Sequence, residues 1–505
     1  MPPEPPGRSD PVTRARRTLR AAACGGLVAT AVSCSGEPAA ATSAGYRVEH
    51  GAILDARGRT LIPRGLNYAN DHKFPAPEDG VFLPPWESPR DFSDLASWGL
   101  DSVRLLVVWE ALEPEPGRYD DVYLEGIRER LDWAQAAGLG VVVDMHQDLY
   151  ARTFTGDGAP PWAVLSDGLP FEPRSPWYLN FASPALLRAI DNFFADRDGV
   201  LSRFVDAWAH VVERLHDHPA LIGYDLLNEP FPGSLFLAPD VADRHDLDPF
   251  YRRLIARLAP LDRAHLFFVE PNPVRTNVLV AGYPTALGPY DEAEGRLVLA
   301  PHLYDPLVTT TLRYTGNDAF ILAGVRGATA EAARLGWGLW FGEWSVWDGR
   351  VEGGRAFLHD QLAAFDEARC GWSYWNLSRN PADLTSPIQS PELLDELARP
   401  QLARVAGEPL AIACEPDRCR FEIREVALAA PTEIRVPARF ATAADVQVEI
   451  DPPRRSAWRS PTAGVAVLEV FPRGSGGPVT MTLARPGASA RARAAHADEA
   501  WSVAP

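Results

Sequence analysis

Two glutamates directly follow apolar stretches that lie far apart in the chain. Glu229 belongs to "LIGYDLLNEP" (221–230), and Glu343 belongs to "GLWFGEW" (338–344). When two carboxyl groups share a site, one can donate a proton while the other acts as a base or a nucleophile. The pair could carry out acid and nucleophile chemistry, provided that the fold brings the two stretches together.

Other apolar stretches also end in residues that can bind or react. Such polar or aromatic residues are Arg64, Gly65 and Asn67, then His146, Gln147 and Asp148, then Asn228, and later His302, Tyr304, Trp375 and Asn376. Arg104 lies inside a β-branched run at 101–109, and Glu270 ends another run at 265–271. One polar residue at one such end is expected where a chain reaches the surface. The repetition at different ends indicates a common site, in which Glu270 could support the others from behind.

The elements that must position these residues alternate along the chain. Strand-like runs at 59–68, 101–109, 139–148, 221–230, 265–271, 297–306, 338–344 and 371–377 are separated by helical patterns near 91–98, 123–138, 202–218, 250–263, 318–335 and 353–369. Runs that are apolar on both faces are typical of parallel strands covered by helices. We therefore predict an α/β fold, a (β/α)8 barrel over residues 46–400, whose chemistry lies at the carboxyl ends of its strands. Pro230 should end the fourth strand and hold Glu229 in an extended conformation.

The segments before and after the predicted barrel differ from it in composition and in hydrophobic pattern. Residues 1–45 carry a basic run, "RARRTLR" (14–20), an apolar run and then Cys34, which is the layout of an export signal with a cysteine open to lipidation. Short alternating runs predict a small antiparallel β-sandwich over 401–487, in which Cys414 and Cys419 could form a disulfide bond, and a disordered tail over 488–505. We expect an exported protein, either extracellular or anchored to a membrane, that acts as a monomer.

Composition and motifs exclude several classes of function. The formal net charge of −18 argues against nucleic acid as a partner. No glycine-rich fingerprint follows the first strand, so we expect no nucleotide cofactor, and we expect no metal.

Two carboxylates across a cleft with aromatic walls fit glycoside hydrolysis. In retaining enzymes the carboxyl groups lie roughly 5–5.5 Å apart. Burial would raise the pKa of the acid, while hydrogen bonds from Tyr304 and Arg104 would keep the nucleophile ionised.

The strand ends "LLNEP" and "FGEW", together with the histidines and Arg104, resemble those of glycoside hydrolase family 5, a set of retaining (β/α)8 enzymes. The resemblance implies that Glu229 is the acid/base and Glu343 the nucleophile. It further implies that Tyr304 and Arg104 orient the nucleophile, and that substrate is bound by Asn228, His146, His302 and Trp375.

Within that family, "DMHQDLY" (144–150), "GDGAPPW" (156–162) and the trailing β domain look like endoglycoceramidases, which cut between the glycan and the ceramide of glycosphingolipids. The likeness adds Asp148, Lys73 and Trp177 to the sugar site. The loop "FPGSLFLAP" (231–239), with "VFLPPW" (81–86), could form an apolar lip for acyl chains or pack on the barrel rim.

Two alternatives stay open. The first is another family 5 activity, as a β-glucanase, a mannanase or a β-glucosidase of sterol or other lipid glucosides. The second is an inactive cell-surface carbohydrate-binding protein, against which the presence of both glutamates argues.

Overall fold

The computed structural model describes residues 45–68, 71, 73–74, 81–84, 86–275, 284–346, 350–381, 383–474 and 476–487. The predicted tail at 488–505 lies outside these residues. So does the predicted export signal at 1–45, which includes Cys34, apart from Gly45. Within the described part of the chain, no helix has both the length and the apolar character needed to cross a bilayer.

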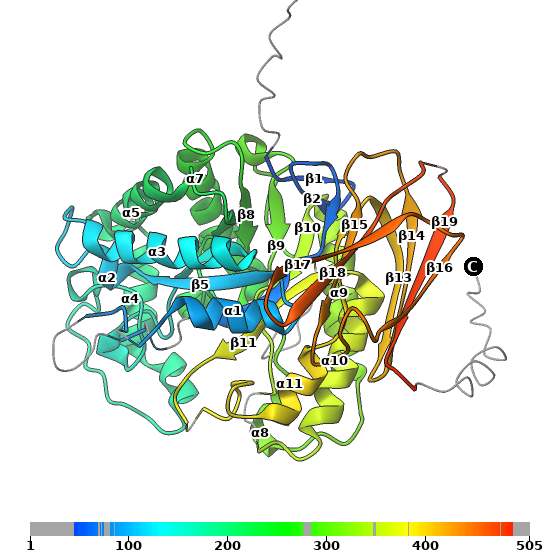
Figure 1. Ribbon diagram of the computed structural model, residues 1–505. Helices are drawn as coiled ribbons and strands as arrows, with labels where there is room; N and C mark the ends of the chain where they lie inside the picture. The colour runs from blue at the N-terminus through cyan, green and yellow to red at the C-terminus, as the bar shows by residue number, and fades with distance from the viewer. Residues whose placement is uncertain are drawn as a thin grey trace, which may run out of the picture. The chain divides into compact units, whose positions relative to one another are not determined.

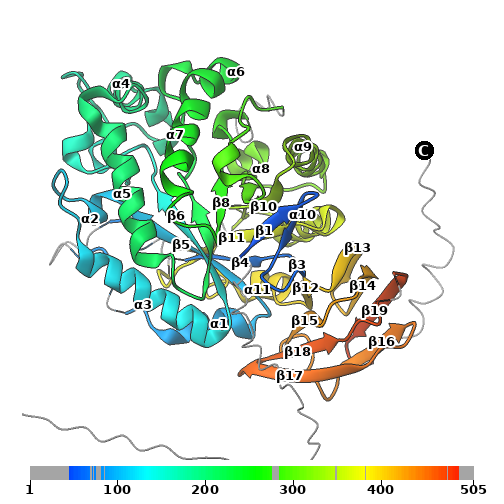
Figure 2. The ribbon, with the colours of Figure 1, turned by 90° about the horizontal axis from the view of Figure 1, so that it is seen from above.

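Eight parallel strands close into a barrel, as predicted (Figures 1 and 2). Sequential strands are neighbours, and the last strand pairs with the first. The strands are β4 (Arg64–Tyr68), β5 (Ser102–Val108), β6 (Gly140–His146), β7 (Leu221–Asp225), β8 (Leu266–Val269), β9 (Leu297–Leu299), β10 (Gly338–Phe341) and β11 (Gly371–Leu377).

Helices surround the barrel (Figure 2). The α-helices are α1 (Pro89–Ser97), α2 (Trp109–Leu112), α3 (Asp121–Ala137), α4 (Pro184–Phe194), α5 (Val200–Leu215), α6 (Pro239–Ala242), α7 (Asp248–Leu258), α8 (Pro306–Thr311), α9 (Ala319–Leu335), α10 (Gly354–Ala368) and α11 (Pro391–Leu397). Short helical turns include η4 (Trp177–Ala182) and η6 (Gly233–Leu235). In α3, the Asp120 side chain accepts hydrogen bonds from the first free backbone N–H groups, and Gly138 ends the helix in the left-handed conformation.

Two antiparallel sheets form the C-terminal domain. The larger has the order β1-β2-β3-β12-β15-β18-β17 and the smaller β13-β14-β19-β16. Their strands are β1 (Arg47–Glu49), β2 (Ala52–Leu54), β3 (Thr60–Leu61), β12 (Gln401–Val405), β13 (Gly407–Glu415), β14 (Arg418–Glu425), β15 (Thr432–Pro437), β16 (Gln447–Asp451), β17 (Ser456–Thr462), β18 (Val465–Val470) and β19 (Pro478–Ala484). Buried residues from both sheets, among them Leu402, Phe421 and Ile434, pack into one core, as in a β-sandwich.

The N-terminal hairpin corrects one assignment. We placed residues 46–61 with the barrel, but β3 pairs with β12 and thereby extends the larger sheet of the sandwich. A short hairpin leaves unpaired backbone groups at its edge, and the nearest partner is a strand from the end of the chain. The chain therefore passes between the two domains twice, once from β3 to β4 and once near residue 400.

The disulfide bond expected between Cys414 and Cys419 is present. It links β13 to β14 across their turn, where the two cysteines are directly opposed.

Candidate active site

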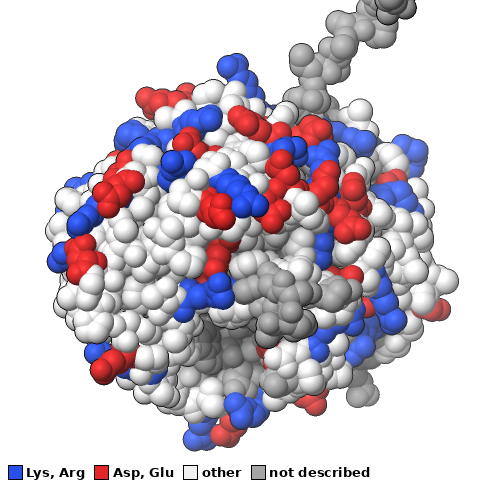
Figure 3. All heavy atoms as spheres, turned by 90° about the vertical axis from the view of Figure 1, so that its left-hand side faces the viewer, with Lys and Arg blue, Asp and Glu red and all other residues white. Residues whose placement is uncertain are grey.

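A cleft of about 730 Å³ opens at the carboxyl ends of the barrel strands. Figure 3 looks at this end of the barrel, where the surface is hollowed. The residues that line the cleft include eight of those predicted for the site, namely Lys73, His146, Asp148, Trp177, Glu229, Tyr304, Glu343 and Trp375. Three more predicted residues lie in contact with this set: Arg104, Asn228 and His302.

The two glutamates meet across this cleft. One carboxylate oxygen of Glu229, one of Glu343 and a ring nitrogen of His302 lie within 4.8 Å of one another. This separation suits the retaining arrangement, and it is shorter than the roughly 6.5–9.5 Å that an inverting enzyme needs to admit a water molecule.

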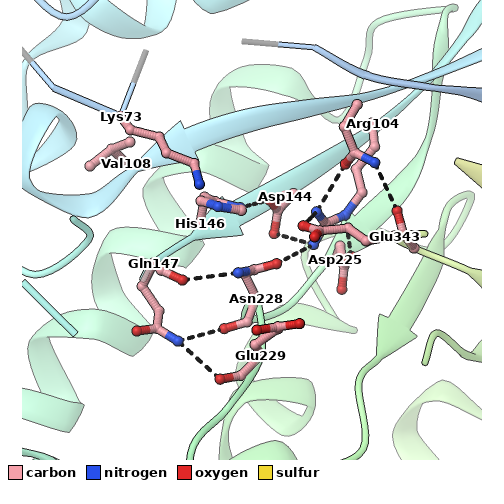
Figure 4. A network of polar contacts seen from close by, with 12 residues as sticks. Lys73, Arg104, Val108, Asp144, His146, Gln147, Asp225, Asn228, Glu229 and Glu343 are labelled. Atoms are coloured by element: carbon pink, nitrogen blue, oxygen red, sulfur yellow. Dashed lines mark hydrogen bonds and ion pairs between the residues drawn. The ribbon is translucent and has the colours of Figure 1, made fainter. Parts of the chain in front are cut away.

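Glu229 is held by its backbone in a way that the sequence did not predict. Its φ is +41°, in the left-handed region, so the extended conformation expected from Pro230 is wrong. Strand β7 ends at Asp225, and beyond it Gln147 donates from Nε2 to the backbone oxygens of Asn228 (2.8 Å) and Glu229 (3.0 Å), as Figure 4 shows. The Glu229 N–H donates to Glu270 Oε2 at 2.8 Å. A proline disfavours the right-handed helical region for the residue before it, and these hydrogen bonds stabilise the left-handed alternative.

Arg104 is the centre of the charged network beneath the cleft (Figure 4). Its guanidinium forms ion pairs with four carboxylates: Asp144 (3.0 Å), Asp225 (2.8 Å), Glu270 (2.9 Å) and Glu343 (2.8 Å). All of these side chains are buried. The arginine also donates to the side-chain oxygens of Asn67 and Asn228, at 3.0 Å each. Asp144, Asp225 and Glu270 could otherwise hold a metal ion, but the guanidinium already lies among them.

Glu343 has the two hydrogen-bond donors that the sequence predicted. Arg104 donates to Oε1, and the Tyr304 hydroxyl donates to Oε2 at 3.0 Å. Burial nevertheless raises the pKa of Glu343 above its ordinary value, and His302 and Arg104 limit this rise without reversing it.

A second cluster surrounds Trp375, on the sugar side of the cleft. Lys73 forms an ion pair with Asp148, and its Nζ lies 4.4 Å from the centroid of the Trp375 ring. The rings of His146 and Trp375 stack with their centroids 5.5 Å apart. The Nδ1 atom of His146 forms a hydrogen bond with Asp144 Oδ2 at 2.7 Å. Burial lowers the pKa of His146 well below its usual range, so it is a neutral hydrogen-bonding group. Burial alone would raise the pKa of Asp148, but Lys73 and His146 hold it low, and a carboxylate results that can accept from sugar hydroxyls.

Another part of the cleft lining is apolar. It comes from η4 and from the loop after Glu229, and includes Trp177, Tyr178, Leu179, Phe181, Phe231, Phe236 and Leu237. Trp177, which we expected in the sugar site, thus lies among apolar side chains. Phe231 connects the two segments, because its ring lies 4.6 Å from Phe181 and 5.8 Å from Phe236. The described part of 81–86 does not line this cleft; Phe82 and Leu83 pack against the barrel core instead. The predicted partner of the loop is therefore replaced by η4.

Two further residues shape the site, and one predicted residue lies outside it. Asp225 lies inside an apolar run, and a charge there was a usable signal that we did not weigh. Asp157 of "GDGAPPW" is buried beside Asp148, lines the cleft and has its pKa raised by burial. Arg64, in contrast, begins β4 rather than ending it, and it pairs with Asp366 at 2.8 Å, so it does not belong to the site.

Comparison with known proteins identifies the family. Residues 72–381 match the cellulase family, glycosyl hydrolase family 5. The match spans more than half of the chain and includes both glutamates and Arg104. The chain belongs to this family and is a glycoside hydrolase.

The relatives within the family narrow the likeness. The chain is 28% identical to endoglycoceramidase I of Rhodococcus hoagii over 464 residues, which covers 86% of this chain and 87% of that protein. Crystal structures of endo-glycoceramidase II from Rhodococcus sp. include a ganglioside GM3 complex (30% identity, TM-score 0.75) and a lactosyl-enzyme intermediate (31%, TM-score 0.74); each covers 86% of this chain and 99% of that one. An endogalactoceramidase structure is also similar (26%, TM-score 0.70, 87% and 99% coverage).

Proposed function

We propose that this protein is a retaining β-glycosidase that cleaves the bond between the glycan and the ceramide of glycosphingolipids. The observation that carries the proposal is a single cleft with two kinds of lining. Together with two close carboxylates it contains a polar cluster, which includes Lys73 and Asp148, and an apolar wall built by η4 and the 231–237 loop. Relatives whose names are endoglycoceramidase support the same substrate class.

The reaction would proceed in two displacements. Glu229, as the acid, protonates the glycosidic oxygen while the Glu343 carboxylate attacks the anomeric carbon, so ceramide leaves and a glycosyl-enzyme ester forms. Glu229, now ionised, removes a proton from water, and the resulting hydroxide displaces Glu343 from the sugar. Each displacement inverts the anomeric carbon, so the released glycan keeps the β configuration.

Neighbouring groups prepare each partner. Arg104 and Tyr304 hold both oxygens of Glu343, which orients the nucleophile and stabilises its charge once the substrate excludes water. His302 places Nδ1 3.0 Å from Glu229 Oε1 and 3.6 Å from Glu343 Oε2, and so fixes the position of the acid.

The sugar side would bind the glycan through three kinds of contact. Trp375 offers an aromatic face to the reacting sugar, Asn228 an amide for its 2-hydroxyl, and the Lys73–Asp148 pair charged hydrogen bonds to hydroxyls further along.

The apolar side would hold the lipid. Leu237 is 71% exposed and Trp177 42% exposed, which is costly unless something apolar covers them. A polysaccharide, which is hydroxylated on both sides of the cleaved bond, could stack on Trp177 but would leave the aliphatic Leu237 uncovered. This argues against the β-glucanase and mannanase alternatives, whereas a lipid glucoside remains the nearest rival.

The test is a direct comparison of products. The protein is incubated in detergent with lactosylceramide, with a cello-oligosaccharide and with a sterol glucoside, and the products are identified by mass spectrometry. Intact ceramide together with free lactose is the expected result. Cleavage of the cello-oligosaccharide alone would refute the lipid proposal, and release of sterol with no cleavage of lactosylceramide would favour the rival. No cleavage of any β-glycoside would favour the inactive binding protein.

We further propose that the chain is exported through its N-terminal segment and acts as a monomer. It would meet membranes through its lipid substrate or through a lipid on Cys34. The basic and apolar runs before that cysteine support this, and the mass of the mature protein from cells would test it.

A further inference from the structure

We infer that Glu270 is the positioning residue of the acid/base: it holds the Glu229 backbone directly and the Glu229 carboxyl group through His302. The inference rests on the proposed function, since it concerns the acid step of that reaction. Glu270 follows β8, is 2% exposed and does not line the cleft. It therefore acts through its neighbours.

Two contacts connect Glu270 to the acid/base by separate routes. Its Oε2 accepts the Glu229 N–H at 2.8 Å, which stabilises the left-handed backbone on which the acid depends. Its Oε1 lies 3.2 Å from His302 Nε2, while the other ring nitrogen of His302 lies 3.0 Å from Glu229 Oε1. The imidazole is thus a bridge between the two glutamates.

The position of Glu270 is itself fixed from behind. Arg104 donates to its Oε1 at 2.9 Å, and the Tyr251 hydroxyl from α7 donates to its backbone oxygen at 2.9 Å. The charged groups that face the Glu270–His302 pair are Arg104, Asp144, Asp225, Glu229 and Glu343. Four of these five are acids, so negative charge predominates around the imidazole.

The pKa shifts agree with this geometry. Burial raises the pKa of Glu270 to about 8. Burial alone would lower the pKa of His302, but Glu270 and Glu343 raise it well above its ordinary value. The pair therefore keeps a proton through neutral pH, and its protons should be treated as shared. Removal of the Glu270 charge lets the proton on His302 leave more readily and so changes the contact that positions the Glu229 carboxyl group.

The test separates acid catalysis from scaffold effects. Glu270→Gln keeps the shape and an acceptor for the Glu229 N–H but removes the charge. The value of kcat/KM is measured across pH on two β-lactosides, one with a dinitrophenyl leaving group, which needs no acid, and one with a poor phenol leaving group. We expect the basic limb to move to lower pH by about one unit, and a loss about tenfold larger on the poor leaving group. The matched control is Asp225→Asn, which also removes a carboxylate from Arg104 but contacts neither His302 nor Glu229. Its charge acts on Glu270 only from a distance, so its selectivity for the poor leaving group should be much smaller than that of Glu270→Gln.

Equal losses of Glu270→Gln on both substrates with an unmoved basic limb would overturn the inference, as would the same selectivity in Asp225→Asn. If the parent enzyme cleaves no β-glycoside, the proposed function fails instead. Should Glu270→Gln not fold, ¹⁵N NMR of the parent decides, with His302 assigned by its absence in His302→Gln. An imidazole that stays protonated above pH 7 supports the inference, and titration near the ordinary value of about 6.5 refutes it.

Discussion

The two ends of the barrel carry buried ionic networks of opposite composition. At the mouth, Arg104 alone faces four carboxylates. At the base, Asp366 of α10 faces two arginines, with Arg64 Nη2 at 2.8 Å and Arg399 Nη2 at 2.9 Å. Arg64 also donates to Gln401 of β12 at 2.8 Å, so the base network joins the barrel to the sandwich.

The difference lies in what the surplus group can do. A guanidinium does not release its proton at physiological pH, so a surplus of arginines can only hold neighbours in place. A surplus of buried carboxylates retains protons, and burial raises the pKa of Asp144, Glu270 and Glu343 even beside Arg104 and His302. The mouth can therefore exchange protons with a substrate, whereas the ion pairs of Asp366 at the base hold neighbouring elements in place.

The largest effect should follow from removal of the nucleophile at the mouth. We expect Glu343→Gly to lower kcat/KM on an aryl β-lactoside by about 10⁴-fold or more, because no covalent intermediate can form. Azide can enter the space that the side chain leaves and should restore turnover, giving a glycosyl azide of α configuration. The product configuration is read by NMR. A β-azide, or a variant as active as the parent, would contradict the assignment of Glu343.

At the base we expect a loss of stability without a loss of chemistry. Asp366→Ala leaves the buried Arg64 and Arg399 without their shared carboxylate and should lower the free energy of unfolding by about 3–5 kcal/mol. Urea unfolding measures this, and kcat/KM well below the melting temperature should stay within about threefold of the parent. The matched control is Glu367→Ala on the same helix, whose exposed pair with Arg326 should contribute less than about 1 kcal/mol. If Asp366→Ala is stable but inactive, the two ends do not differ as stated.

The sequence predicted the mouth much better than the base. Runs such as 101–109 and 139–148 can be assigned as strands from the sequence because parallel strands are apolar on both faces. A polar residue at the end of such a run then stands out from its apolar neighbours. Arg64 was assigned to the carboxyl end of the first barrel strand because the predicted strand began five residues too early. In the structure β4 begins at Arg64, which therefore lies at the amino end of that strand. The pairing of β3 with β12 depends on residues more than 300 positions apart, and no local pattern specifies it.

Backbone detail at the site was also beyond the sequence. Pro230 narrows the conformations of Glu229 but does not choose among those that remain. The choice comes from Gln147 and Glu270, which reach Glu229 from other strand ends. The role of η4 as the apolar wall was missed for a similar reason, since aromatic residues at 177–181 fit a core as well as a cleft.

The contributions of the polar and apolar parts of the cleft can be distinguished by comparing a lipid substrate with a soluble one. Phe236→Asp places a charge on the apolar wall and should reduce lactosylceramide cleavage about tenfold or more, while hydrolysis of a soluble aryl lactoside changes little. Leu237→Asp, at a position 71% exposed, should act in the same direction with less risk to folding. Val122→Asp, at an exposed position on α3, is the control and should affect neither substrate. Equal losses on the lipid and the soluble substrate would show that the loop only braces the rim.

The last prediction concerns how stability depends on pH, and it again separates the mouth from the base. Glu270 has a pKa of about 8 in the folded protein and an ordinary value near 4.5, so the folded protein holds a proton that the unfolded chain has released between these values. The contribution of this group to the free energy of unfolding therefore falls as pH rises through this window, and the raised pKa of His302 acts in the same direction above pH 6.5. Urea unfolding at pH 5 to 8 should give a curve that falls more steeply, or rises less, with pH in the parent than in Glu270→Gln. The lowered pKa of His146 acts in the opposite direction but is common to both proteins. The free energy of unfolding of Asp366→Ala should be lower than that of the parent at every pH, and its dependence on pH should be unchanged. The reason is that the arginines at the base do not titrate in this range. Parallel curves for the parent and Glu270→Gln would mean that the carboxylates at the mouth hold no extra proton, and the contrast between the two ends would then be one of geometry alone.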